Sequence, residues 1–182
     1  YNPGKPAYFI RIGGCDECCN WCDVKSSWNP HTHPATKTDD IVANAAMYPA
    51  KAVVITGGEP LNYNLDYLCS ELKKRDIQTF IETSGSSTLT GQWDWICLSP
   101  KKNKAPLPAI LPMAHELKVI IEKDLDFEWA ERFRQQVSPS CRLYLQPEWS
   151  GYQKTIGPIV DYILQHPWWN ISLQSHKFMH IP

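Results

Sequence analysis

The sequence predicts an α/β fold: a partial, open βα barrel with mainly parallel strands and few covering helices. Two observations support this prediction. Short β-rich apolar runs recur along the chain, at 7–14, 51–58, 78–85, 93–100, 115–123, 141–149 and 170–176. Amphipathic helical patterns lie between several of these runs, at 38–48, 64–75, 126–137 and 152–165. Strands that alternate with helices favour a parallel sheet with right-handed crossovers.

The strand runs share one design, because each passes into small or polar residues at its C-terminal end. The first three are AYFIRIGG, KAVVITGG and QTFIETSG. The remaining four are WDWICLSP, HELKVIIEK, CRLYLQPEW and NISLQSH. Runs with high β propensity that are bounded by Gly, Ser and Pro are typical of strands. In parallel α/β folds, reactive groups collect at these C-terminal ends.

The helical segments place apolar side chains three and four positions apart, which predicts one buried face each. In the first two and the last of these segments the apolar residues are Ile41, Val42, Ala45, Ala46, Leu65, Leu68, Cys69, Leu72, Ile156, Ile159, Val160, Ile163 and Leu164. The connections after the third and fourth strands are too short or too rich in proline for full helices, which predicts an open barrel. No internal repeat or linker divides the chain, so residues 1–182 are expected to form one domain.

Composition excludes several classes of protein. With 43% hydrophobic and 20% charged residues, the chain is an ordinary globular one rather than a disordered one. A formal net charge of −1 without a basic run gives no support to a nucleic-acid or anionic-membrane partner. No apolar run reaches the ~20 residues that span a bilayer. The first residue is Tyr1, so we expect that an upstream part of the protein is missing from this sequence.

The seven cysteines are an odd number, which disfavours a secreted disulfide framework. Cys69, Cys97 and Cys141 each lie in an apolar stretch, as buried free thiols do. The other four crowd into GGCDECCNWCD, residues 13–23. We therefore expect a protein of the reducing cytoplasm in which this cluster binds a metal.

Two ligand sets compete within the cluster. Two Cys-x2-Cys pairs, starting at Cys15 and Cys19, suggest a zinc site, but zinc sites usually separate their pairs by a dozen residues or more. The spacing Cys15-x3-Cys19-x2-Cys22 leaves Cys18 outside and suits a [4Fe–4S] cube with one open iron. An open iron allows chemistry, whereas a closed four-thiolate site is structural.

The second set resembles the signature of radical S-adenosylmethionine (SAM) enzymes, with Trp21 as the usual aromatic before the last cysteine. TGGEP, residues 56–60, resembles the motif in that superfamily that holds the methionine end of SAM. Glycines suit such a place because they allow close backbone approach to a ligand. The likeness narrows to the 7-carboxy-7-deazaguanine synthase (QueE) family, along essentially the whole chain. The supporting stretches are FIRIGGC, NWCDVKSSW, VVITGGEPL, IETSGS, WICLSPKKN, LQPEW and SLQSHKFMHIP.

The resemblance implies a carbon–nitrogen lyase of queuosine and 7-deazapurine biosynthesis. In that family a 5′-deoxyadenosyl radical takes a hydrogen from 6-carboxy-5,6,7,8-tetrahydropterin. Ring contraction with loss of ammonia then gives 7-carboxy-7-deazaguanine. The cofactors implied are a [4Fe–4S] cluster, SAM, which is re-formed, and Mg²⁺. A homodimer and an electron donor such as a flavodoxin are implied as well.

The resemblance also assigns residues, and none is given a catalytic role beyond the cluster and SAM. The iron ligands are Cys15, Cys19 and Cys22. Contacts with the cofactor are expected from Trp21, Cys22, Asp23, Gly57, Gly58, Glu59, Ser84, Ser99, Pro100, Lys101, Gln146, Pro147 and Glu148. Contacts with the substrate are expected from Arg11, Thr56, Gln174, His176, Lys177 and the terminal carboxylate of Pro182. Arg11 has a structural alternative, an ion pair with Glu82 or Glu148 inside the fold.

Two departures from the family pattern stand out. Many members have a threonine whose hydroxyl binds Mg²⁺ at the position of Val24, which has no side-chain oxygen. Ser26 or Ser27 substitutes, or water and substrate complete the shell, or magnesium matters less here. The family also usually has a Gln-Gly-Glu-Gly strand near its start, which is not found here and which we expect upstream of Tyr1.

Two other functions stay open at this point. Activating enzymes of glycyl-radical proteins share the cysteine and GGEP motifs, but not the SPK, QP and LQSHK elements seen here. They act on a large protein partner instead of a pterin. The other alternative is a non-catalytic module that binds zinc through the cysteine cluster. Metal content separates this last reading from the first two.

Overall fold

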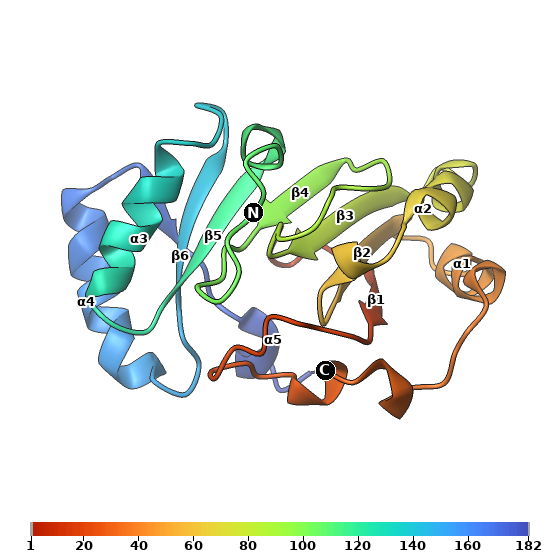
Figure 1. The fold of residues 1–182 in the computed structure, drawn as a ribbon, viewed down its shortest axis with the longest axis horizontal. Coiled ribbons are helices and arrows are strands. Elements are labelled where there is room, and N and C mark those ends of the chain that lie inside the picture. Colours follow the sequence, from red (N-terminus) through yellow and green to blue (C-terminus); the bar gives the residue numbers. More distant parts are fainter. Residues whose placement is uncertain (1, 182) are drawn as a thin grey trace.

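The computed structural model describes residues 2–181, and its seven strands form one sheet in the order β1 to β7. All six neighbouring pairs are parallel. The sheet curves without closing, so β1 and β7 are its two edges (Figure 1). The strands are β1 Tyr8–Ile12, β2 Ala52–Gly57, β3 Gln78–Thr83, β4 Trp95–Leu98, β5 Glu116–Ile121, β6 Arg142–Pro147 and β7 Trp169–Ile171.

Four helices cover the outer face of the sheet, in pairs toward its two ends (Figure 1). They are α1 Thr38–Ala46, α2 Asp66–Lys73, α3 Leu125–Arg134 and α4 Tyr152–Gln165. Packing of α2 on β3, α3 on β5 and α4 on β6 and β7 buries their apolar faces. A short helix, α5 Ser175–Phe178, lies apart from these four, beside the segment that follows β1 (Figure 1).

Alternation along the strands separates a core face from a polar face. Val53 and Ile55 of β2 are fully buried and face the helices. Thr56, the residue after Ile55, therefore faces the opposite side of the sheet. Thr56 is in register with Arg11 of β1, and Glu82 of β3 is in register with Cys97 of β4. The register therefore builds a row of polar side chains across the face that the four helices leave uncovered.

The prediction of an open βα barrel with parallel strands and few helices is confirmed. Each of the first six predicted strands contains an observed one, and the four predicted helices are present with ends shifted by a few residues. The connections that follow β3 and β4 contain no α-helix, only the one-turn 3₁₀ segment Leu111–Met113 among these described residues. Within residues 2–181, no helix is long and apolar enough to cross a membrane.

One predicted element is wrong at its end. The run 170–176 was expected to be a strand, but β7 stops at Ile171 and α5 begins at Ser175. Ser172 N–H still donates to Leu145 O at 2.9 Å, and this is where the contact with β6 ends. The next residue of β6 able to continue the ladder would be Pro147, which has no N–H. The edge strand therefore ends and the chain turns into a helix.

Candidate functional site

The cysteine loop lies directly after β1 and is fixed at its base by backbone hydrogen bonds. Gly14 N–H donates to Ser27 O at 2.7 Å and Cys15 N–H to Trp28 O at 3.1 Å. On the other side, Glu59 N–H donates to Gly14 O at 2.8 Å. The loop is therefore held between the segment that follows it and the turn after β2. This places it at the C-terminal ends of the strands, where the parallel fold gathers functional groups.

The glycines of TGGEP have a reason that differs from the one expected from the sequence. A Cβ on Gly58 would lie 2.1 Å from Gly14 O and 3.0 Å from Cys15 Cβ. A Cβ on Gly57 would lie 2.1 Å from Ile12 O. Both positions need glycine because the turn packs against the backbone of β1 and of the cysteine loop. Close approach to the loop, rather than to a ligand alone, explains these two residues.

The four clustered cysteines divide into three and one. Cys15, Cys19 and Cys22 are partly buried, and Cys22 N–H donates to Cys19 O at 2.9 Å in a tight turn. Cys18 is exposed and has a φ of 46°, in the left-handed region that side chains other than glycine seldom adopt. Its exposure sets Cys18 apart from the other three cysteines, which are partly buried. The arrangement supports the ligand set Cys15, Cys19 and Cys22.

The donor set fits an iron–sulfur cube better than a single metal ion. Among the described residues, no three His, Cys, Asp or Glu side chains are grouped to hold one ion. A cube does not need such convergence, since each thiolate meets a different iron. Burial raises the pKa of Cys19 to about 11, although the charge of Lys101 opposes this. Cluster binding must therefore provide the free energy that deprotonates the Cys19 thiol.

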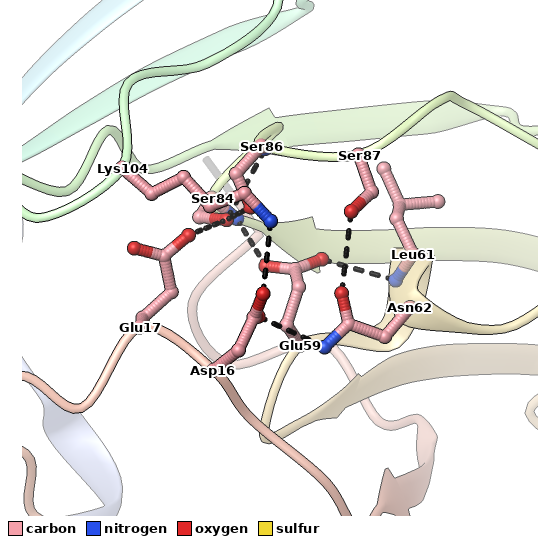
Figure 2. Close-up of polar contacts among 9 residues, drawn as sticks. All are labelled: Asp16, Glu17, Glu59, Leu61, Asn62, Ser84, Ser86, Ser87 and Lys104. Atoms are coloured by element: carbon pink, nitrogen blue, oxygen red, sulfur yellow. Dashed lines mark hydrogen bonds and ion pairs between the residues drawn. The ribbon is translucent and has the colours of Figure 1, made fainter.

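Glu59, the acidic residue of TGGEP, is buried and ties two strands together. Its Oε1 accepts from Leu61 N–H at 3.0 Å and from Thr83 Oγ at 2.5 Å. Its Oε2 accepts from Ser84 N–H at 2.7 Å (Figure 2). The carboxylate thereby fixes the turn after β2 to the end of β3. Three donors already occupy the group that the sequence places at the methionine end of SAM.

The SPK motif after β4 brings three predicted cofactor residues together. Lys101 Nζ donates to Ser99 Oγ at 2.7 Å and lies 5.2 Å from the ring centroid of Trp21. Pro100, between them, is buried. Burial lowers the pKa of Lys101, and the neighbouring Cys19 opposes this effect. Among the described residues Lys101 has no ion pair, so its charge is available to an anionic ligand beside the cysteine loop.

Ser84 contacts Glu17, a residue of the site that the sequence did not predict. Its hydroxyl donates to Glu17 Oε1 at 3.0 Å and lies 3.0 Å from Ser86 Oγ. Glu17 belongs to the cysteine loop and is only 3% exposed. The signal in the sequence was an acidic residue between two cluster cysteines, but charged loop residues are usually exposed.

The QPEW motif after β6 is used mainly within the fold. Gln146 Oε1 accepts from Ser172 Oγ at 3.0 Å, and Pro147 ends the strand. Both oxygens of Glu148 are engaged by Ser150 and by Gly151 N–H, at 2.7 to 2.8 Å. Glu148 therefore holds the turn that begins α4. Burial acts to raise the pKa of Glu148, but its hydrogen bonds with Ser150 and Gly151 and the charge of Lys177 lower it.

The predicted substrate residues come from two parts of the chain. Arg11 and Thr56 are side by side on the polar face of β1 and β2. Burial lowers the pKa of His176 in α5, and the charges of Lys177 and Arg11 lower it further, although the charge of Asp23 opposes them. Arg11 makes no ion pair with another described residue, and Glu82 is bound by Lys118 at 2.6 Å instead. The internal ion pair considered for Arg11 is therefore not formed with Glu82 or Glu148.

Asp23 contacts the C-terminal segment. Its Oδ2 accepts from Gln174 Nε2 at 2.7 Å and from Lys177 Nζ at 2.5 Å. The predicted SAM contact of Asp23 and the predicted substrate contacts of Gln174 and Lys177 thus meet in one hydrogen-bonded group. Pro182, expected to reach the substrate, lies outside the described residues.

The side chains around Val24 offer little to a magnesium ion. The hydroxyl of Ser27 is buried and donates to Val24 O at 2.7 Å, so it serves the loop. Ser26 is exposed and is the remaining side-chain oxygen of the two serines considered. One exposed hydroxyl is a weak donor set for Mg²⁺, which prefers several oxygens around it. The residues present do not by themselves form a magnesium site.

Comparisons with known proteins identify the family of this chain. The family model described as "Radical SAM superfamily" matches residues 9–97. The 7-carboxy-7-deazaguanine synthase of Flavobacterium psychrophilum is 53% identical over 182 residues, covering 100% of this chain and 86% of that protein. That of a Synechocystis species is 48% identical over 176 residues, covering 97% of this chain and 84% of that protein.

A solved structure gives the same result for the fold. The crystal structure of QueE from Escherichia coli matches with a TM-score of 0.79 and 27% sequence identity, covering 94% of this chain and 86% of that one. The chain is a radical SAM enzyme and belongs to the family of the 7-carboxy-7-deazaguanine synthases.

Proposed function

We propose that this enzyme converts 6-carboxy-5,6,7,8-tetrahydropterin to 7-carboxy-7-deazaguanine with loss of ammonia. The observation that carries the proposal is the position of three partly buried thiols, Cys15, Cys19 and Cys22, at the strand ends beside the Arg11–Thr56 row. The names of the relatives support the product. The continuous sheet supports treating residues 1–182 as one functional domain.

In this proposal the cysteine loop holds the [4Fe–4S] cluster through Cys15, Cys19 and Cys22 as thiolates. The cluster and SAM, when bound, supply the one-electron chemistry that removes a hydrogen atom from the substrate. Lys101 would offset negative charge beside the loop, and its ammonium lies 5.2 Å from the centroid of the Trp21 ring, within the range of a cation–π contact. The turn at Gly57 and Gly58 presents backbone groups to the methionine end of SAM.

The substrate would bind on the polar face, next to the cluster loop. The Arg11 guanidinium has no ion pair among the described residues and suits the planar carboxylate of the pterin as a bidentate donor. The Thr56 hydroxyl lies beside it in register. Asp23 fixes Gln174 and Lys177, and so holds α5, which carries His176, beside the cysteine loop. Pro182, at the end of the same segment, is proposed to complete the substrate contacts.

Water and the substrate are proposed as the main ligands of Mg²⁺, and Ser26 is the candidate for a side-chain ligand. The hydroxyl of Ser27 is committed to Val24 O, which leaves Ser26 as the exposed alternative. We assign no step of the reaction to magnesium. Titration of Mg²⁺ against turnover in Ser26→Ala tests this assignment, since more Mg²⁺ should be needed for half-maximal turnover than in the wild type.

Three further features complete the proposal. An electron donor such as a flavodoxin would reduce the cluster, because radical SAM chemistry begins with one electron. Seven free cysteines suit a reducing, cytoplasmic compartment. A homodimer is supported by apolar side chains exposed around the β7 edge: Val160, Leu164, Trp168, Ile171 and Leu173. Light scattering of the reconstituted protein tests the dimer.

Metal analysis and an anaerobic assay test the function and separate it from the alternatives. The chain is reconstituted with iron and sulfide and then given SAM, a reductant and the carboxy-tetrahydropterin. We expect iron and sulfide in equal amounts and the deazapurine product by mass spectrometry. One tightly held zinc would favour the zinc-binding module. A full cluster without pterin turnover, but with hydrogen abstraction from a protein glycine, would favour the activase.

A further inference from the structure

Glu17 is a buried carboxylate with one oxygen unaccounted for. It lies in the cysteine loop, two residues from both Cys15 and Cys19, and is 3% exposed. Its Oε1 accepts from Ser84 Oγ at 3.0 Å (Figure 2). Its Oε2 is buried and has no hydrogen-bond partner among the described residues. A buried, unpaired carboxylate oxygen is costly, so this one calls for a donor.

The neighbouring groups do not supply that donor. The nearest lysine of the same network, Lys104, pairs with Asp16 at 2.9 Å (Figure 2). Lys101 donates to Ser99. The side-chain amide of Asn103 donates to the backbone carbonyl of Glu17 at 2.7 Å and not to its carboxylate. The charge of Glu17 is therefore without a cation among the ion pairs of residues 2–181.

Glu17 and Glu59 both accept hydrogen bonds from Ser84, but they differ in how many further hydrogen bonds their carboxylates can accept. Glu59 already accepts three hydrogen bonds, from Leu61, Thr83 and Ser84. Glu17 accepts one, on the oxygen that faces Ser84. The acceptor capacity that remains in this part of the site thus belongs to Glu17. Because Glu17 lies between two proposed iron ligands, its unpaired oxygen Oε2 lies where SAM is expected to bind.

We propose that Glu17 is a further SAM-binding residue, whose Oε2 accepts a hydrogen bond from an O–H or N–H donor of bound SAM. The inference rests on the proposed function. SAM carries two kinds of suitable donor, the ribose hydroxyls and the methionyl amino group. Either one satisfies the buried oxygen, and a charged acceptor makes a stronger bond than a neutral one. Ser84 positions the carboxylate through its other oxygen.

The test measures SAM affinity without the pterin, by anaerobic calorimetry on the cluster-reconstituted chain. Glu17→Gln keeps the shape and removes the charge, and we expect SAM to bind about tenfold more weakly. Asp16→Asn is the matched control, since Asp16 is the adjacent, exposed carboxylate paired with Lys104. The control should bind SAM as the wild type does. Equal affinity of Glu17→Gln and wild type overturns the inference.

Two analogues identify the donor. 5′-Methylthioadenosine keeps the ribose and lacks the amino acid, whereas S-adenosylhomocysteine keeps both. If Glu17→Gln binds both analogues about tenfold more weakly than the wild type does, the donor is a ribose hydroxyl. If the affinity of Glu17→Gln falls for S-adenosylhomocysteine and not for 5′-methylthioadenosine, the donor is the amino group. Iron content is measured on every sample. If Glu17→Gln fails to hold iron, Glu17→Asp is used in its place. This variant keeps the charge and moves the carboxylate back by one methylene.

These outcomes separate the inference from the function on which it rests. If the wild-type chain with its cluster does not bind SAM, the proposed function fails and the inference fails with it. If the wild type binds SAM and the Glu17 variants bind equally well, only the role of Glu17 is wrong. Turnover of the pterin is not needed for either conclusion.

Discussion

Lys177, in the last helix of the chain, donates a hydrogen bond of 2.5 Å to Oδ2 of Asp23, the residue directly after Cys22. Gln174 donates to the same oxygen at 2.7 Å. The Lys177 ammonium also lies 4.7 Å from the centroid of the Trp149 ring. Residues separated by 154 positions in sequence thereby join the cysteine loop to the C-terminal segment. The position of the C-terminal segment therefore depends on the position of the loop.

Replacing Lys177 tests this connection. In Lys177→Ala we expect the free energy of unfolding to fall by about 1–2 kcal/mol, because a charge-assisted hydrogen bond at a half-exposed site is lost. The KM for the pterin should rise while the iron content stays unchanged. Lys74→Ala is the control, since Lys74 forms an exposed ion pair within α2. An unchanged KM in Lys177→Ala would mean that α5 is placed without Asp23.

The division of the cysteines predicts opposite effects at neighbouring positions. Cys18→Ala should keep its iron content and turnover, because Cys18 is exposed whereas the other three cysteines of the loop are partly buried. Cys19→Ala should lose both, since one of three thiolates is removed. Iron and sulfide analysis after anaerobic reconstitution checks the pair. Loss of the cluster in Cys18→Ala would show that the ligand spacing is misassigned.

Gly58 should be required for the cysteine loop to take its position. In Gly58→Ala the new Cβ would meet Gly14 O at 2.1 Å, a backbone atom that cannot move without the loop. We expect reduced cluster content and a lower Tm. Gly157→Ala is the control, because a Cβ on this α4 residue meets nothing within 4 Å. That variant should be slightly stabilised, by up to ~1 kcal/mol.

The Glu82–Lys118 pair predicts a pH dependence. Burial acts to raise the pKa of Glu82, but the charge and hydrogen bond of Lys118 outweigh it and the pKa is lowered. Burial acts to lower the pKa of Lys118, but nearby negative groups raise it. The pair therefore stabilises the fold between the ordinary pKa values of 4.5 and 10.5, and the Glu82 contribution is lost as pH falls below 4.5.

In Lys118→Met the pKa of Glu82 should rise, so Tm should begin to fall at a higher pH than in the wild type. Glu82 is about a third exposed, so the loss at neutral pH should be smaller than the ~3–5 kcal/mol of a fully buried pair. Tm measured from about pH 4 to about pH 8 checks this. The double variant Glu82→Gln, Lys118→Met should not show the shifted onset. Parallel Tm curves for single variant and wild type would contradict the assignment.

Val24 allows a prediction about magnesium. Val24→Thr adds the hydroxyl that many family members have at this position, so less Mg²⁺ should be needed for half-maximal turnover. Val24→Ser, with a smaller hydroxyl side chain, should act in the same direction. A Mg²⁺ titration of the anaerobic assay measures the effect. Identical titrations in wild type and Val24→Thr would show that this position does not contribute to magnesium binding.

The sequence was sufficient for most of the fold. Strand runs with high β propensity and apolar helical faces predicted seven parallel strands and four helices, because these patterns report burial directly. It misplaced the last strand, since the end of β7 depends on the register with Pro147. Register between strands is a property of the assembled sheet and is not visible in either run alone.

The site was predictable where motifs are local and less so where contacts are distant. The spacing of Cys15, Cys19 and Cys22 and the TGGEP turn were readable from the sequence. Glu17 was missed because its burial depends on how the loop lies over Ser84. The contact of Asp23 with Lys177 was also missed, because no pattern links residues so far apart.

The most direct test of the account is the anaerobic conversion of 6-carboxy-5,6,7,8-tetrahydropterin by the chain with a full [4Fe–4S] cluster. Product and SAM are measured together over time by mass spectrometry. We predict that 7-carboxy-7-deazaguanine accumulates over several turnovers per chain while the SAM concentration stays constant. Cluster-loaded chain that binds SAM and yet forms no 7-carboxy-7-deazaguanine would contradict the account.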